Sequence, residues 1–300
     1  MDAGNGHPAA NGGKSRGNER VSDRTGRDTA LWEAHMRQWN LLGPPLRPSA
    51  EDLRLFQREI DAWREAHGAT AAAGLVLGVT PELPALQWPA GSRVFAADNS
   101  VEMIAYVWYL TAPFAAGAVA ARWQALPFRE GSIDVALGDG CFTLCEWPAG
   151  YAQFGESVRR VLAPGGRLVI RVHLRPGNVE APEVVLAELR AGRIASFNSF
   201  KWRLLVALHG ERADGIRLHE VWEYWRKFGI GEDALAEQTG WPAAVIRTIH
   251  AYRDKSIVYF FPTLAEMRAV LAPCFREIAC HRPDYDCSDL HRVFVLEALR

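Results

Sequence analysis

The apolar residues near the start of the chain recur at helical spacing. A predicted helix over residues 29–42 gathers large side chains near one face, namely Leu31, Trp32, His35, Met36 and Trp39. Gly43-Pro44-Pro45 ends it. Ser49 then has the features of a helix N-cap, because Glu51 and Asp52 follow in the first turn, where the helix dipole favours acidic side chains. A second helix is therefore expected to end near Gly68, giving N-terminal helices over residues 29–68.

From residue 74 the pattern changes to short apolar runs separated by amphipathic stretches. The runs predict strands over 74–78, 93–97, 118–121, 133–138 and 167–173, with helices over 100–110 and 151–162. Strands that alternate with helices are typical of a parallel sheet covered on both faces, so the fold class is expected to be α/β.

After Pro176 helical periodicity replaces the strands. Helices are predicted over 183–190, 199–208, 218–228, 232–239 and 243–253. A helix over 264–271 and two strands, 275–281 and 292–296, follow. We interpret residues 177–260 as a helical insertion, or cap, in a single domain that spans residues 29–300.

The first 28 residues contain six glycines and few large apolar side chains. Such a segment buries too little surface to offset its ordering entropy, so residues 1–28 are predicted to be a disordered tail. No apolar stretch follows the basic residues of the tail, which argues against a signal peptide.

Composition narrows the class of protein further. Lys and Arg number 34 and Asp and Glu 35, a net charge of −1 that lacks the basic surface of a general nucleic-acid binder. The longest apolar run, residues 71–79, falls well short of the roughly 20 residues of a membrane helix. Five cysteines without a CxxC pair predict no metal site and suit a reducing, cytoplasmic compartment.

Candidate chemistry lies after the predicted strands, because ligands of open α/β sheets bind at the carboxyl ends of the strands. Gly78, Val79 and Thr80 follow the first strand, and Asp98 and Asn99 follow the second. Asp98 lies twenty residues after Gly78, the spacing at which an acidic residue accepts hydrogen bonds from ribose hydroxyls.

Several segments in this order resemble a class I S-adenosylmethionine-dependent methyltransferase. The resemblance covers residues 70–175 and the C-terminal strand pair, and its motifs are the loop at 78–80, Asp98, Arg122-Trp123-Gln124-Ala125-Leu126-Pro127-Phe128, residues 133–140 and residues 161–170. It implies a Rossmann-like sheet with an antiparallel C-terminal strand pair, S-adenosylmethionine as cofactor and S-adenosylhomocysteine as product. The implied cofactor-binding residues are Gly78, Val79, Thr80, Asp98, Asn99, Met103, Arg122, Trp123, Asp139 and Gly140.

The sequence departs from the family at three places. Thr80 and Glu82 occupy two glycine positions of the first loop, Val76 replaces the usual acid, and Arg122 replaces the acid that reads adenine. A nicotinamide dehydrogenase also ends its second strand in an acid. Its pyrophosphate needs three glycines, however, and this loop keeps one, which favours the methyltransferase.

Methyl transfer needs a base only when the acceptor carries a proton. His173 at the end of the fifth strand and Asp139 after the fourth are the catalytic candidates, although a structural histidine and a turn-capping aspartate are alternative interpretations. Five of the eleven tryptophans lie where a pocket is expected, and their clustering suggests a small-molecule acceptor with an aromatic or apolar portion: Trp108, Trp123, Trp202, Trp222 and Trp225. Candidate substrate-binding residues are Phe142, His219, Trp222 and Tyr224.

Two other functions stay open at this point. Residues 234–246 resemble a helix-turn-helix, although residues 226–255 carry nearly balanced charges, which disfavours DNA as a partner. The altered first loop also suits a methyltransferase-like binding module without catalysis. The sequence does not specify the oligomeric state.

Overall fold

The computed structural model describes residues 1, 38–108 and 114–300. The predicted tail beyond residue 1, and residues 29–37 of the first predicted helix, therefore lie outside the described residues. The described part of that helix is a single 3₁₀ turn, η1 (Trp39–Leu41).

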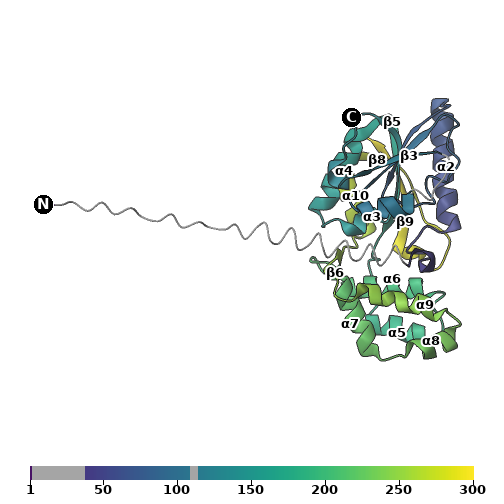
Figure 1. Cartoon of the computed structure of the whole chain (residues 1–300), viewed down its shortest axis with the longest axis vertical. Coiled ribbons are helices and arrows are strands. Elements are labelled where there is room, and N and C mark those ends of the chain that lie inside the picture. The colour runs from purple at the N-terminus through teal and green to yellow at the C-terminus, as the bar shows by residue number, and fades with distance from the viewer. Residues whose placement is uncertain (2–37, 109–113) are drawn as a thin grey trace.

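A seven-stranded sheet forms the centre of the molecule, in the order β3-β2-β1-β4-β5-β9-β8 (Figure 1). Its strands are β1 (Ala73–Leu77), β2 (Arg93–Asp98), β3 (Ala115–Ala120), β4 (Ile133–Asp139), β5 (Leu162–His173), β8 (Phe275–His281) and β9 (His291–Ala298). Strands β1 to β5 are parallel, and β9 runs antiparallel to both β5 and β8. This confirms the predicted α/β sheet with an antiparallel C-terminal pair.

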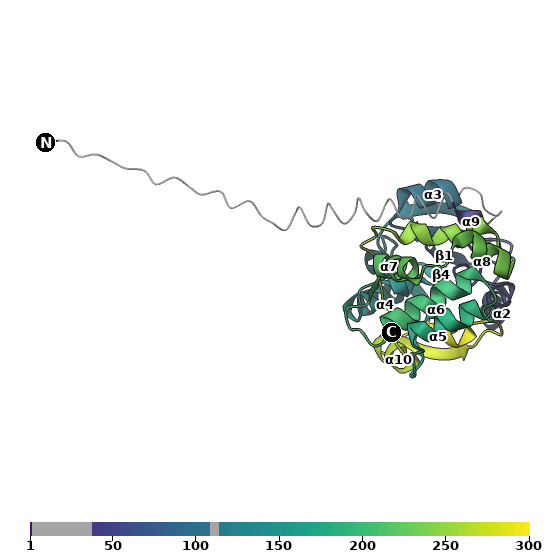
Figure 2. The same ribbon diagram turned by 90° about the horizontal axis from the view of Figure 1, so that it is seen from below.

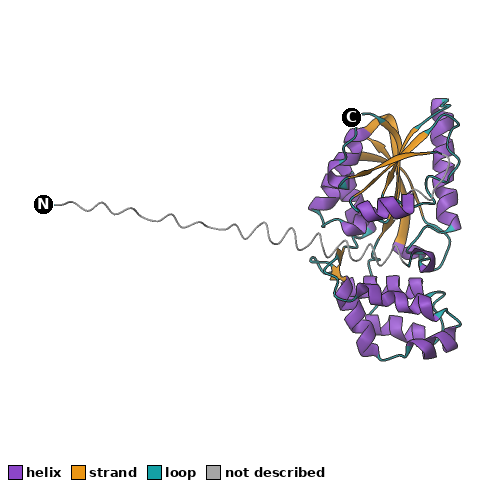
Figure 3. Ribbon diagram, in the orientation of Figure 1, coloured by secondary structure: helices purple, strands orange, loops and turns teal. Residues whose placement is uncertain are grey.

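Helices cover both faces of the sheet (Figure 3). Helices α2 (Ala50–His67) and α3 (Val101–Val107) pack on one face, where Phe56 and Ile60 are fully buried. Helices α4 (Ala149–Val161) and α10 (Leu264–Leu271) pack on the other. Ser49 is the N-cap of α2. Its hydroxyl accepts from the backbone N–H of Asp52, and the Asp52 carboxylate accepts from the backbone N–H of Ser49. This capping box confirms the predicted N-cap.

The insertion forms a layer of helices beyond the carboxyl ends of the strands (Figures 1 and 2). It contains α5 (Pro182–Arg190), α6 (Phe197–His209), α7 (Leu218–Phe228), α8 (Glu232–Thr239), α9 (Ala243–Ile246) and the 3₁₀ segment η5 (Arg247–Tyr252). These helices enclose their own apolar core, which includes Phe200, Trp225 and Ile249. We call this layer the cap.

Two predicted bounds were wrong, and one strand pair was not predicted. The helix predicted over 243–253 ends at Ile246 and continues as η5. Four of the five residues from Val245 to Ile249 are β-branched and therefore poor helix formers, and the Thr248 hydroxyl donates back to the Val245 carbonyl. The third strand lies at 115–120 instead of 118–121, since its small residues give no clear alternation. An antiparallel pair, β6 (Ile216–Arg217) and β7 (Val258–Tyr259), is too short for periodicity to reveal.

In the described part of the chain, every helix is too short or too polar to cross a membrane. All five cysteines are free thiols.

Candidate functional site

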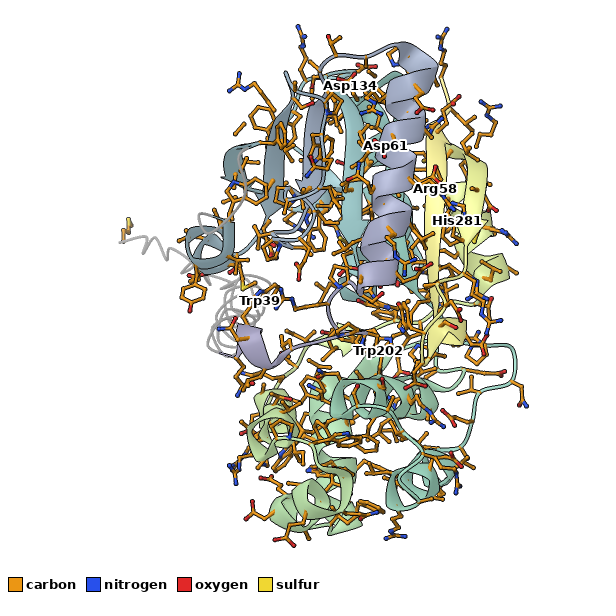
Figure 4. All side chains as sticks on the ribbon, turned by 90° about the vertical axis from the view of Figure 1, so that its right-hand side faces the viewer. Trp39, Arg58, Asp61, Asp134, Trp202 and His281 are labelled. Carbon is orange, nitrogen blue, oxygen red and sulfur yellow. The ribbon has the colours of Figure 1, made fainter. Side chains whose placement is uncertain are left out.

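A cleft lies between the sheet and the cap, at the carboxyl ends of β1, β2 and β4. Nine of the residues predicted from the sequence line it: Gly78, Val79, Thr80, Asp98, Met103, Trp123, Asp139, Gly140 and His173. The segment before α2 adds Trp39, Leu42, Leu46 and Arg47, and the cap adds Trp202, Tyr252 and Tyr259. Figure 4 shows Trp39 and Trp202 at the level between the sheet and the cap.

Asp98 presents a carboxylate without a basic partner to this cleft. Its Oδ1 accepts from the backbone N–H of Ser100 at 2.8 Å, and no Lys, Arg or His among the described residues forms an ion pair with it. Burial raises its pKa to about 6. Its Oδ2 lies beside Gly78, where a Cβ would sit 3.8 Å away and where the backbone has a φ of +95°. Asp98 therefore presents its Oδ2 beside the backbone of Gly78, which has no side chain.

Trp123 closes the cleft next to Asp98. Its Nε1 donates to the Ala97 carbonyl at 2.7 Å, and its ring lies 3.8 Å from the position of a Gly78 Cβ. Met103 is almost fully buried nearby. Two other predicted cofactor-binding residues, Asn99 and Arg122, are exposed and do not line the cleft.

The floor of the cleft is an ion network around Arg171, which is fully buried. Arg171 donates from Nε to Asp139 Oδ1 at 2.5 Å and from Nη2 to Asp139 Oδ2 at 3.1 Å. It also contacts Asp52 at 3.4 Å, the Tyr285 hydroxyl at 3.1 Å and the Pro45 carbonyl at 3.0 Å. Burial raises the pKa of Asp139, and the Arg171 guanidinium opposes that shift. Arg171 thus favours the ionised form of Asp139, with which it forms an ion pair.

His173 forms a neutral pair with His291. Their Nδ1 atoms lie 2.7 Å apart, so one ring donates to the other, and burial lowers the pKa of both imidazoles well below the usual value. The Nε2 of His173 faces Gly140, where a Cβ would lie only 2.7 Å away and φ is +68°. The Trp202 ring packs edge-on at 4.3 Å between ring centroids. His173 thus offers an uncharged nitrogen at the wall of the cleft.

The four predicted substrate-binding residues lie elsewhere. Phe142 is buried in the core, stacked on Tyr151. His219, Trp222 and Tyr224 are on α7, and their polar atoms already bond within the cap, to Asp254, His250 and Glu183 respectively. None of the four lines the cleft, so the aromatic wall of the cap comes from Trp202, Tyr252 and Tyr259.

The sequence patterns do not single out Arg171, Arg47 or the two cap tyrosines. Arg171 sits inside an apolar strand, and a charged residue at a buried strand position is the one signal that marks it. Within residues 1, 38–108 and 114–300, no group of His, Cys, Asp and Glu is arranged to hold a metal ion.

Comparison with known proteins supports the fold and the family. Residues 75–170 match a family model described as a methyltransferase domain. A search of curated protein sequences gives no significant match.

Two solved structures share the fold. A Rhodobacter sphaeroides protein described as a zinc-dependent alcohol dehydrogenase is 14% identical, with a TM-score of 0.60, over 91% of this chain and 99% of that one. The Burkholderia thailandensis 1,6-didemethyltoxoflavin-N1-methyltransferase, solved with its substrate and S-adenosylhomocysteine, is 15% identical, with a TM-score of 0.50, over 98% of this chain and 94% of that one. At this identity both likenesses concern the fold alone, whereas the family match covers the segments that bear the methyltransferase motifs.

Proposed function

We propose that this chain, which carries a class I S-adenosylmethionine-dependent methyltransferase domain, transfers the cofactor's methyl group to a small molecule held between the sheet and the cap. The observation that carries the proposal is the convergence of three features in one cleft. These are the Asp98 Oδ2 beside Gly78, the uncharged His173 and the aromatic cap wall.

The residues of the cleft fit the cofactor. Asp98 places its Oδ2 beside Gly78 as an acceptor for a ribose hydroxyl, and Gly78 leaves room for close approach. Met103 and Trp123 provide apolar surface on the β2 side for the adenine ring. The sheet order β2-β1-β4 then directs the amino-acid end of the cofactor toward β4. When bound, the cofactor supplies an activated methyl group on its sulfonium, and the protein needs only to align the acceptor with it.

The acceptor side of the cleft is aromatic. Trp202, Tyr252 and Tyr259 line it from the cap, and this suits an acceptor with a flat or apolar portion. The indole N–H of Trp202 is buried and has no hydrogen-bond partner among the described residues. A polar atom of the bound acceptor would satisfy it, since a buried unpaired donor is costly.

His173 is the proposed base for an acceptor that carries a proton. Because its imidazole is neutral, one ring nitrogen is free to accept, and the tautomer in which His173 Nδ1 donates to His291 leaves Nε2 as that acceptor. Asp139 is proposed to shape the floor of the cleft instead of taking the proton, because both its oxygens are engaged by Arg171.

The structure does not favour a DNA-binding function. Helix α9 contains four residues, too few to place a recognition helix in a major groove. The basic side chains that follow it are already paired with acids, Arg247 with Asp233 and His250 with Glu232. We therefore propose no nucleic-acid partner.

Isothermal titration calorimetry with S-adenosylhomocysteine tests the proposal. We expect saturable binding, followed by a co-crystal structure with the ribose hydroxyls on Asp98. Absence of heat at millimolar ligand would refute the proposed enzyme. Binding without methyl transfer to any of a panel of planar hydroxyl and amine acceptors would instead favour the non-catalytic binding module.

A further inference from the structure

An incompletely satisfied ion pair lies at the edge of the cleft, between the segment before α2 and the loop after β1. Arg47 donates from Nε to Glu82 Oε1 at 2.8 Å, and its Nη2 donates to the same oxygen. Its Nη1 donates to the Trp39 carbonyl at 3.3 Å, and the guanidinium lies 4.8 Å from the centroid of the Trp39 ring. The pair thus fixes the orientation of Arg47, which itself lines the cleft.

Both members of the pair keep unused bonding capacity. Glu82 Oε2 is buried and has no hydrogen-bond partner among the described residues. With respect to the described residues, the three bonds made by Arg47 leave part of its set of N–H donors without a partner. A buried carboxylate oxygen without a donor is costly, so this arrangement suits a ligand that brings a cation to Glu82 and an anion to Arg47.

The position of the pair indicates which ligand that is. With the ribose on Asp98 at the end of β2, the order β2-β1-β4 leads the rest of the cofactor past Gly78 toward β4. Asp139 ends β4, and the Glu82 carboxylate is close enough to raise the pKa of Asp139. Arg47 follows Pro45 by two residues, and the Pro45 carbonyl is held by the same Arg171 that binds Asp139. The ion pair therefore lies within electrostatic range of Asp139 at the end of β4.

Apart from Glu82, the loop after β1 offers no acid that could bind the cation of the ligand. Val76 stands where the resembled family has its acid, and Glu82 occupies a glycine position of the same loop. Asp139 is close by, but each of its oxygens already accepts from Arg171. Glu82 Oε2, in contrast, accepts from no described residue.

We propose that Arg47 and Glu82 form the subsite for the α-amino-acid end of the cofactor. Glu82 Oε2 accepts from the α-ammonium group, and the free N–H groups of Arg47 donate to the α-carboxylate. This inference rests on the proposed function. In this assignment Arg47, which lies in the segment before α2 and outside the sheet, contacts the bound cofactor. That contact would hold the segment over the cofactor.

Two ligands that differ only at this end provide the test. S-adenosylhomocysteine carries the amino-acid zwitterion, and 5′-methylthioadenosine lacks it. Calorimetry with both ligands on wild type, Arg47→Met and Glu82→Gln separates this subsite from the ribose and adenine contacts. Arg203→Met is a matched control, because Arg203 forms a similarly half-buried pair with Glu180 in the cap.

We expect each cleft variant to bind S-adenosylhomocysteine at least about tenfold more weakly, the loss of one charge-assisted hydrogen bond, and to bind 5′-methylthioadenosine like wild type. The Arg203→Met control should bind both ligands like wild type. If Arg47→Met does not fold, Glu82→Gln, which preserves side-chain size, tests the proposed subsite by itself.

Two results would overturn the inference while leaving the proposed function intact. One is an unchanged affinity for S-adenosylhomocysteine in Glu82→Gln. The other is a parallel loss of affinity for both ligands, which would show that the pair only holds the segment in place. A wild-type protein that binds neither ligand would refute the proposed function, and this subsite with it.

Discussion

Replacing Asp98 with Asn is expected to stabilise the ligand-free protein and to weaken its binding of the cofactor. Burial raises the pKa of Asp98 from 3.8 to about 6, so ionising it in the folded state at pH 7 costs up to about 3 kcal/mol, at roughly 1.4 kcal/mol per pKa unit. Asn removes the charge, and its Oδ1 retains the bond from the Ser100 N–H. The free energy of unfolding should therefore rise at pH 7.

The pH dependence of stability shows whether the higher free energy of unfolding comes from removal of the Asp98 charge or from better packing. Because the folded-state pKa exceeds the unfolded value, the folded protein binds more protons between pH 3.8 and about 6, and the Asp98 contribution to stability falls as pH rises through that window. The stability difference between Asp98→Asn and wild type should grow across this window and stay constant above it. Chemical denaturation at a series of pH values measures it.

Cofactor binding should change in the opposite direction. The variant replaces the carboxylate oxygen proposed to accept from the ribose with an amide N–H group, which cannot accept. Loss of one hydrogen bond to a charged group, about 1.5–3 kcal/mol, predicts affinity for S-adenosylhomocysteine about 10- to 100-fold weaker by calorimetry. Asp134→Asn is the control, because Asp134 accepts from the Ala73 N–H at the far end of the sheet (Figure 4). Unchanged affinity in Asp98→Asn would show that the ribose does not lie on β2, and unchanged stability would show that the burial argument fails.

Three further predictions concern other parts of the molecule. Gly140→Ala should impair methyl transfer and lower stability by about 1 kcal/mol or more, because the new Cβ would lie 2.7 Å from His173 Nε2 at a φ of +68°; wild-type thermal unfolding and turnover would contradict this. Lys201 is buried in the cap with one hydrogen bond, to Thr248, and burial lowers its pKa to about 7. Wild type should therefore gain stability as pH rises from about 7 to 10.5, and Lys201→Met should lack that gain and be more stable at pH 7 by up to about 4 kcal/mol, as denaturation curves would show. Finally, random duplex DNA should not be retarded by the protein in a mobility-shift assay near 0.15 M salt, and a salt-sensitive shift would restore the helix-turn-helix interpretation.

Local chemistry made much of the fold predictable. The Ser49 cap, the strand at Ile133 and the bounds of α7, α8, α10 and β8 follow from periodicity and turn residues, which are properties of neighbouring positions. The two-residue strands β6 and β7 depend on a pairing between Ile216 and Tyr259. A pattern within one segment cannot reveal it.

The site was predictable to the extent that it follows the ends of strands. Asp98, Gly140 and His173 lie in the cleft because parallel strands bring their carboxyl ends to one edge. The cap was not predictable in this way. Aromatic residues occur on α6, α7 and η5 alike. Which of them meet the cleft is decided by packing in three dimensions, so Trp222 lies away from the cleft while Tyr252 lines it.

The Arg171 network has a consequence for the modularity of the domain. The family match ends at residue 170, immediately before Arg171. The charge of Arg171 is balanced by Asp139 and by Asp52 of α2, and its guanidinium also donates to the Tyr285 hydroxyl near β9. Residues 75–170 on their own would lack Arg171, and Asp139 would lose its counter-ion. The matched segment is thus smaller than the set of elements that the Arg171 network joins. A chimera that exchanges this methyltransferase core between proteins must carry α2, β5 and the C-terminal strands with it.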